Sequence, residues 1–187
     1  FLKELLSAKD KRKQRNKLDK IQKYEEITDR IEVEVADYLL TVSQGEISES
    51  SSLKVRSMLD IVSEIEQIGD ICYQMSRTYD RKIEIKAWFT LEQRRNLLGM
   101  FDLLDRVFDN MIYNLEHKYE DIDLKKAEDL EKAVNDLRDT IRKEHLDNMG
   151  SGNYNIDSGM IYNDLYSGLE KTGDHIMQIN NAIAGKV

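Results

Sequence analysis

Proline is absent from the 187-residue chain, and cysteine occurs only once, at Cys72. Because proline interrupts helices and is common in turns and disordered linkers, its absence favours a helix-rich chain. A single cysteine excludes an internal disulfide framework and is typical of a reducing compartment, so we expect the protein to be cytoplasmic. No apolar run approaches the roughly 20 residues that a membrane-spanning helix needs, and no secretory signal is evident.

Positive charge is in deficit, because 28 lysines and arginines face 36 acidic residues and give a net charge of −8. This balance disfavours nonspecific binding to nucleic-acid phosphates, so we expect no nucleic-acid partner. The exception is Lys9–Lys20, with seven basic and two acidic residues and a net charge of +5 (7 − 2). Two interpretations remain open: a solvated helix face, or a peripheral contact with an anionic membrane, where each basic residue contributes roughly 1 kcal/mol.

Helical periodicity is the main pattern in the sequence. Apolar residues recur at spacings of three and four and predict helices over residues 9–42, 52–86, 90–117 and 123–149, with a fifth from Asp157 to near Ala184. Thr90 and Gln93 form a predicted capping box at the start of the third helix, and Asp157 is the predicted cap of the fifth. The predicted fold class is therefore all-α.

The sequence also contains an internal duplication. SEIEQIGD at residues 63–70 returns as SGLEKTGD at residues 167–174, an offset of 104, and the fourth predicted helix aligns with the first at an offset of 106. The third helix has no upstream counterpart. We therefore predict two antiparallel three-helix bundles, over residues 1–86 and 90–187, with the first helix of the first bundle largely missing. Phe1–Ser7 would be the tail of that helix, and the chain, which does not begin with methionine, would be a fragment.

The repeated phrase is locally unfavourable for a helix. Glu66 and Asp70 lie four residues apart on one side of their helix, where like charges cost roughly 0.2–0.5 kcal/mol. Gly69, between them, costs about 1 kcal/mol relative to alanine. Both features recur in the second copy of the phrase, and unfavourable choices repeated at matching places are typical of a functional site. Each glycine would also allow a neighbouring helix to approach closely.

A metal ion would resolve the repulsion between these carboxylates. Carboxylates from two neighbouring helices can share a hard or borderline cation, and the first helix offers Glu25 and Asp29, again four residues apart. The fourth expected pair is Glu131 with Asn135, whose amide oxygen carries no charge, so we expect weaker binding at the second site unless Asp136 or Asp139 compensates. The predicted metal ligands are Glu25, Asp29, Glu66, Asp70, Glu131, Asn135, Glu170 and Asp174. The alternative is that these side chains simply face water.

These motifs, E-x-I-G-D at 66–70, E-x-x-G-D at 170–174 and E-x-x-x-D at 25–29, resemble those of the PhoU family. The resemblance spans nearly the whole chain and implies an all-α fold of two repeated three-helix bundles that bind metal ions, often as iron or zinc clusters. The runs KYEEITDRIEVEVADYL and VRSMLDIVSEIEQIGDICYQMSR are more specifically similar to the PhoU-like domain at the C-terminus of bacterial sodium/phosphate cotransporters. Gln67 and Lys171 depart from the family, which commonly has arginine after the first glutamate of the motif.

The resemblance further implies a regulatory role in phosphate uptake and homeostasis rather than catalysis. The implied cofactors are iron, zinc or manganese ions. The implied partners are the membrane domain of a transporter or a phosphate-signalling protein, together with further copies of the chain. The implied location is the cytoplasmic face of the inner membrane.

Two other functional classes are alternatives to a regulatory role in phosphate homeostasis. An enzyme is unsupported, because the Glu-x-x-His pattern of di-iron bundles is missing and Cys72 lies on an apolar stripe, where packing is its expected role. His175, next to Asp174, is expected to be solvated or to lie just outside a metal site. A metal-free helical adaptor is the second alternative. Trp88 and Phe89 would then belong to an interface or seal the junction between the bundles.

Overall fold

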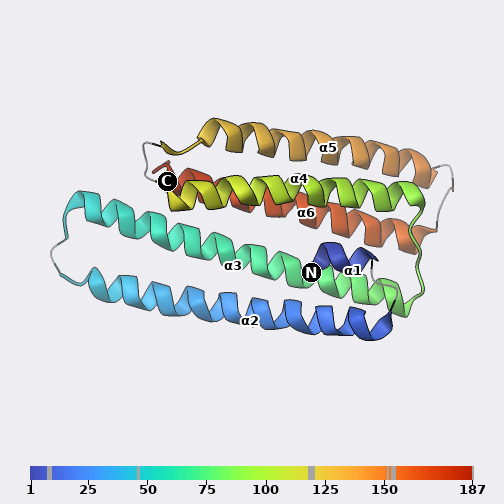
Figure 1. The fold of residues 1–187 in the computed structure, drawn as a ribbon, viewed down its shortest axis with the longest axis horizontal. Coiled ribbons are helices and arrows are strands. Elements are labelled where there is room, and N and C mark those ends of the chain that lie inside the picture. Colours follow the sequence, from blue (N-terminus) through green and yellow to red (C-terminus); the bar gives the residue numbers. More distant parts are fainter. Residues whose placement is uncertain (8–9, 46, 118–120, 151, 153–154, 187) are drawn as a thin grey trace.

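The computed structural model describes residues 1–7, 10–45, 47–117, 121–150, 152 and 155–186, and within these residues it contains six helices and no strand. The predicted all-α fold class is therefore confirmed. The helices are α1 (Leu2–Ser7), α2 (Lys11–Val42), α3 (Glu49–Glu84), α4 (Leu91–Glu116), α5 (Leu124–Gly150) and α6 (Ile156–Ile183) (Figure 1).

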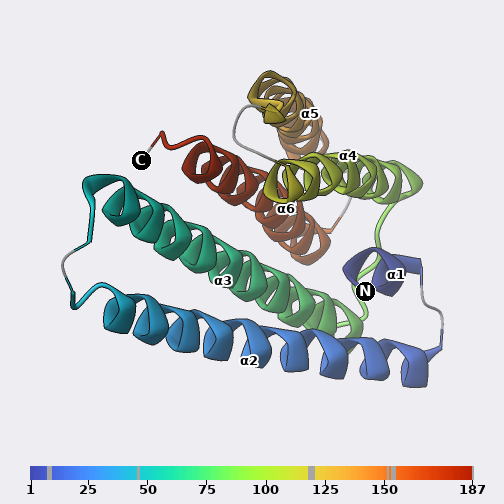
Figure 2. The same ribbon diagram turned by 60° about the vertical axis from the view of Figure 1, so that its left-hand side comes forward.

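The long helices form two layers. Helices α2 and α3 make an antiparallel hairpin, and α4, α5 and α6 make an antiparallel three-helix bundle beside it (Figures 1 and 2). Helix α3 packs along α6 and joins the two layers, whereas α1 contacts α2, α3 and α4. The first bundle thus has two long helices and a six-residue third one, in agreement with the predicted loss of most of its first helix.

The described helix ends show which predicted caps are correct. The Thr90–Gln93 capping box is confirmed. The backbone N–H of Gln93 donates to Thr90 Oγ1 over 3.1 Å, and the backbone N–H of Thr90 donates to Gln93 Oε1 over 2.9 Å. The predicted cap of α6 is wrong, because Asn155 Oδ1 accepts the hydrogen bond from the Ser158 amide, at 3.2 Å. Asp157 instead lies in the first turn, where its charge suits the positive end of the helix dipole.

The duplication reappears in the packing of the two hairpins. A Cβ atom built on Gly69 would lie 2.5 Å from Oγ1 of Thr28, and one built on Gly173 would lie 3.3 Å from Cγ1 of Val134. The contact positions differ by 106 on the first helix (134 − 28) and by 104 on the second (173 − 69). These are the offsets of the sequence repeat, so equivalent residues meet at equivalent places in the two hairpins.

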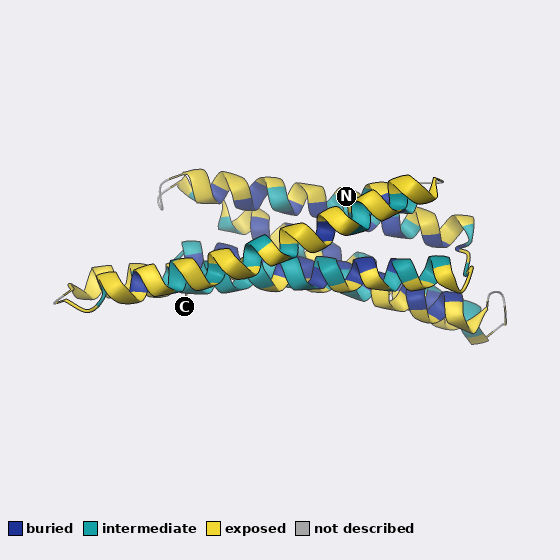
Figure 3. Cartoon of the chain, turned by 90° about the horizontal axis from the view of Figure 1, so that it is seen from below, coloured by how far each residue is buried: buried dark blue, intermediate teal, exposed yellow. Residues whose placement is uncertain are grey.

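The core is distributed unevenly between the layers. One continuous apolar cluster includes buried residues of α3, α4, α5 and α6. Among the described side chains of α2, by contrast, only Ile21 and Leu39 are buried. In Figure 3, where α2 is the helix nearest the viewer, it is coloured mostly as exposed or intermediate. The division into bundles over residues 1–86 and 90–187 stays a prediction, because the cluster crosses that boundary.

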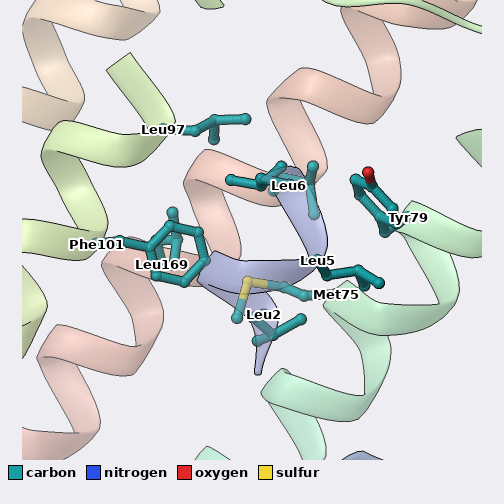
Figure 4. Close-up of a pocket in the computed structure, with 9 residues that line it drawn as sticks. Leu2, Leu5, Leu6, Met75, Tyr79, Leu97, Phe101 and Leu169 are labelled. Carbon is teal, nitrogen blue, oxygen red and sulfur yellow. The ribbon is translucent and has the colours of Figure 1, made fainter. Parts of the chain in front are cut away.

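Helix α1 is held at the junction of the two layers. Leu5 has no exposed surface, and Figure 4 shows the α1 leucines among side chains of α3, α4 and α6. The residues around this small pocket are Leu2, Leu5, Leu6, Met75, Tyr79, Leu97, Phe101, Leu165 and Leu169. Lys3 adds ion pairs to Asp102 at 2.7 Å and Asp105 at 2.5 Å on α4, and Glu4 pairs with Lys17 on α2.

The segment between α3 and α4 contains the two aromatic residues expected at a junction. Phe89 is buried, with its ring 6.1 Å from that of Tyr162, and therefore does seal the junction. Trp88 does not, because 57% of its surface is exposed. Cys72 packs half-buried against the core as expected, and burial raises the pKa of its thiol to about 11, so it stays protonated at neutral pH.

The Gly69–Thr28 contact predicts the effect of Gly69→Ala. Because the new methyl group would meet Oγ1 of Thr28, we expect a loss of about 1–2 kcal/mol in the free energy of unfolding, measured by denaturant titration. Adding Thr28→Ala should recover most of this loss. The control is Gly99→Ala, which meets nothing within 4 Å and should stabilise the protein by about 0.5–1 kcal/mol. Equal effects of Gly69→Ala and Gly99→Ala would contradict the close approach.

Candidate metal centre

The first acidic cluster consists of Glu25 and Asp29 on α2 with Glu66 and Asp70 on α3. On each helix the two acids flank the contact residue, three positions before it and one after it, so the Thr28–Gly69 contact brings the acids of both helices together. One carboxylate oxygen each from Glu25, Asp29 and Asp70 lie within 4.8 Å of one another. The structure thus gathers three of the four predicted ligands of the first site.

Glu66 lies beside this triad rather than within it. Its Oε2 accepts a hydrogen bond of 2.8 Å from Nε2 of the neighbouring Gln67. Burial raises the pKa of Glu66, and the charges of Asp70, Glu32 and Asp29 raise it further. Glu66 is therefore electrostatically part of the first acidic cluster.

The first acidic cluster is a concentration of negative charge. Burial and the charges of Asp29, Asp70 and Glu26 raise the pKa of Glu25. Among the residues that the structure describes, no lysine, arginine or histidine forms an ion pair with the four acids of this cluster. A donor set made only of carboxylate oxygens suits hard cations such as magnesium, calcium or manganese best, and carboxylates can also act as ligands of iron and zinc. Glu25, Asp29 and Asp70 could hold such an ion, with Glu66 beside them.

The second acidic cluster consists of Glu131 and Asn135 on α5 with Glu170 and Asp174 on α6. Arg138 Nη1 lies 2.8 Å from Oε1 of Glu170, and Asn135 Nδ2 donates to Oε1 of Glu131 over 2.6 Å. Within the described residues, these carboxylates do not come together as the first triad does. A guanidinium and an amide, both from α5, already satisfy two of the carboxylates.

The acids proposed to compensate for Asn135 face other partners. Asp136 pairs with Lys132 at 2.7 Å, and Asp139 lies 3.0 Å from Nε of Arg138. Burial raises the pKa values of Glu170 and Asp174, while the charge of Arg138 lowers both. A metal ion fits this donor set poorly, because it would compete with the guanidinium for the same oxygens.

His175 and Arg138 contribute interactions that sequence reasoning missed. His175 Nδ1 lies 2.6 Å from Oε2 of Glu64, which links α6 to α3, so the histidine is half-buried rather than fully solvated. No local pattern joins residues 111 positions apart. The role of Arg138 could have been predicted from the repeat, because the offset of 106 aligns Arg138 with Glu32 (138 − 106) and so shows a basic residue where the first copy has an acid.

The basic segment predicted to lie near a membrane is divided by the structure. Lys9 lies outside the described residues. Lys17 pairs with Glu4 of α1, and Lys20 lies over the ring of Phe1, which precedes α1. The remaining basic residues, Lys11, Arg12, Lys13 and Arg15, are exposed at the start of α2. None of the described helices is both long and apolar enough to cross a membrane. The membrane contact stays a prediction.

Comparison with known proteins bears on the first half of the chain. A family model described as the PhoU domain matches residues 1–78, which cover α1, α2 and most of α3. This confirms the resemblance for that stretch, which includes all four acids of the first acidic cluster. No curated protein and no solved structure matches the chain.

The raised pKa values predict a pH-dependent stability of the metal-free protein. An acid whose folded pKa lies above its unfolded value binds more protons when folded, so its contribution to stability falls as the pH rises through that window. In EDTA, Glu25→Gln should therefore raise the thermal unfolding midpoint at pH 7 and have less effect at about pH 4, near the ordinary glutamate pKa.

The control for this prediction is Glu34→Gln, which removes the same charge from an exposed position of the same helix. It should change the midpoint little at either pH. A Glu25→Gln protein that is no more stable than the wild type at pH 7 would contradict the repulsion among these carboxylates.

Proposed function

We propose that the chain is a PhoU-like regulatory domain in phosphate homeostasis, whose first acidic cluster binds an iron, zinc or manganese ion. One observation carries this proposal: the stretch that matches the PhoU domain, residues 1–78, is also the stretch that brings Glu25, Asp29 and Asp70 together. The role is regulatory rather than catalytic, in keeping with what the family resemblance implies.

The ion would act mainly through its charge. Bound by Glu25, Asp29 and Asp70, it would offset the repulsion between carboxylates of α2 and α3, and a hard cation also attracts phosphate oxygens. The chain's own residues provide the remainder of the site. Gly69 allows the helices to approach, Thr28 fills the space above it, and Glu66 adds a further charge beside the triad.

The proposal extends to the larger protein of which this domain would be a part. We propose that it is the soluble C-terminal part of a sodium-dependent phosphate transporter, at the cytoplasmic face of the inner membrane. The similarity of residues 23–39 and 55–77 to such domains supports this, as do the exposed basic residues at the start of α2. The regulated partner would be the transporter's membrane domain or a phosphate-signalling protein.

The metal assignment predicts the metal content of the purified protein. Protein prepared without added metals or chelators should contain stoichiometric iron, zinc or manganese by elemental analysis. Asp29→Asn with Asp70→Asn should remove most of this metal, because two of the three gathered carboxylates lose their charge. In cells, the same variant should lose the control of phosphate uptake, measured with labelled phosphate.

The matched control is Asp37→Asn with Asp109→Asn, which removes two charges from exposed positions of α2 and α4. This variant should keep both the metal and the phosphate response. Wild-type protein that is folded, metal-free and unable to take up added metal would contradict the metal assignment.

A metal-free adaptor is the second candidate, and the exposed apolar surface of the α2–α3 hairpin favours it. Tyr38 is 68% exposed and Met58 is 49% exposed. Further exposed apolar side chains on this hairpin are Ile31, Val33, Leu40, Val42 and Leu53. Ile31, Tyr38 and Val42 share one face of α2, whereas Val33 and Leu40 lie on the opposite face. An exposed apolar helix face is typical of a site that binds another protein.

Replacing this exposed surface separates the two candidates. Tyr38→Lys with Met58→Lys should change the free energy of unfolding by no more than about 0.5 kcal/mol per site, because both side chains are exposed. If the adaptor role is correct, the phosphate response is lost while the metal content is unchanged. A variant with an intact phosphate response would exclude this surface as the docking site.

A further inference from the structure

The two acidic clusters differ at two positions that the offset of the repeat aligns with each other. The offset of 106 aligns Glu25 with Glu131, Asp29 with Asn135, and Glu32 with Arg138. Positions 25, 29 and 32 follow the spacing of one helix face, as do 131, 135 and 138. The first acidic cluster, counted with Glu32, therefore has five carboxylates and a charge of −5, whereas the second, counted with Arg138, has three carboxylates and one guanidinium, a charge of −2.

Arg138 forms an ion pair with an acid of the second acidic cluster. Its guanidinium bonds Glu170 at 2.8 Å, and only 26% of the Arg138 side chain and 14% of the Glu170 side chain are exposed. Burial raises the pKa of Asp174, one turn further along α6, and the charge of Arg138 opposes this rise. The same residue thus acts on both acids that α6 contributes to the second acidic cluster.

We infer that Arg138 is the resident cation of the second acidic cluster, that this cluster consequently takes no metal ion, and that the first acidic cluster alone is open to an external cation. The inference deepens the proposed function, because it limits the metal to one of the two repeats. Residues 32 and 138 occupy the same position in the two repeats. An acid at this position leaves the cluster open to a metal ion, whereas an arginine takes the place of the metal.

The chemistry of the side chain supports this role. Arginine is permanently charged, and its planar fork matches a carboxylate, so it can replace a small cation between acids. A metal ion that took Glu170 from Arg138 would break the ion pair between these two largely buried side chains and leave the exposed Asp139, 3.0 Å from Nε, as the described partner of the guanidinium, and breaking such a pair is costly. The amide of Asn135 also donates to Glu131 and so occupies an oxygen that a metal would need.

In the first acidic cluster the residue that corresponds to Arg138 is Glu32, which adds a negative charge and so increases the repulsion that a cation would offset. Glu32 is half-buried on α2, and its charge raises the pKa of Glu66 on α3. Glu32→Arg would therefore place a resident cation where Arg138 lies in the second repeat. The same helix contact, Thr28 on Gly69, would remain unchanged.

The second acidic cluster is best tested in a protein whose first acidic cluster has been disabled by Asp29→Asn with Asp70→Asn. The thermal unfolding midpoint of this parent variant, measured in EDTA and then in manganese or zinc, should not rise with metal. Adding Asn135→Asp with Arg138→Glu reproduces the first cluster's acids. The resulting protein should have a lower unfolding midpoint in EDTA than its parent. It should show a metal-dependent rise of about 5–10 °C when the metal concentration is a hundredfold above Kd.

The matched control is Arg142→Glu, one turn further along α5 and exposed, which should create no metal response. The inference is overturned if the parent variant keeps a metal-dependent rise that Glu170→Gln abolishes. It is also overturned if the folded Asn135→Asp, Arg138→Glu protein gains no response to metal.

A second variant decides the question if the first does not fold. Glu32→Arg in the otherwise natural chain should abolish the metal response of the first acidic cluster without lowering the midpoint in EDTA, whereas Glu34→Arg should leave the response intact. A Glu32→Arg protein that still responds to metal overturns the inference. Failure of the proposed metal function looks different, because the wild type and its Asp29→Asn, Asp70→Asn variant would then respond equally to metal.

Discussion

The close contact between the two long helices of each hairpin is the constraint on which the other features depend. Thr28 lies on Gly69 and Val134 lies on Gly173, so the helices approach at equivalent points. The acidic positions flank these contact residues on both helices, and the packing that brings the helices together also brings their carboxylates together. Burial of apolar surface elsewhere along the hairpin must offset this repulsion, unless a cation removes it.

The two repeats meet this requirement with different chemistry on the same backbone arrangement. The second bundle has three full-length helices and a guanidinium within its acidic cluster, so its own residues provide both the packing and the charge balance. Among the described residues, the acidic cluster of α2 and α3 has no counter-cation from a lysine, arginine or histidine. Helix α2 has few buried side chains, and this acidic cluster consists of carboxylates alone. The stretch that matches the PhoU domain, residues 1–78, thus contains the acidic cluster that has no described counter-cation.

Most of the fold could be predicted from the sequence, because it depends on local patterns. Helix boundaries follow apolar spacing and caps, and the described α3 begins only three residues before its predicted start at residue 52. The triad of Glu25, Asp29 and Asp70 follows from helix periodicity together with the repeat. The docking of Lys3 on Asp102 and Asp105, 99 and 102 residues away, and the pairing of His175 with Glu64 leave no local pattern, because they depend on how the layers pack.

Helix α3 connects these features physically. It provides Glu66 and Asp70 to the first acidic cluster, contacts α1 through Met75 and Tyr79, and packs along α6. Glu64 of α3 pairs with His175, the residue after Asp174 of the second acidic cluster. A change in the spacing of α2 and α3 therefore acts on a helix that also contacts α6, whose own acids are balanced by Arg138 from within the second bundle. Under the assignment proposed above, the second bundle would need no external ion and would form a fixed support against which α2 and α3 respond to one.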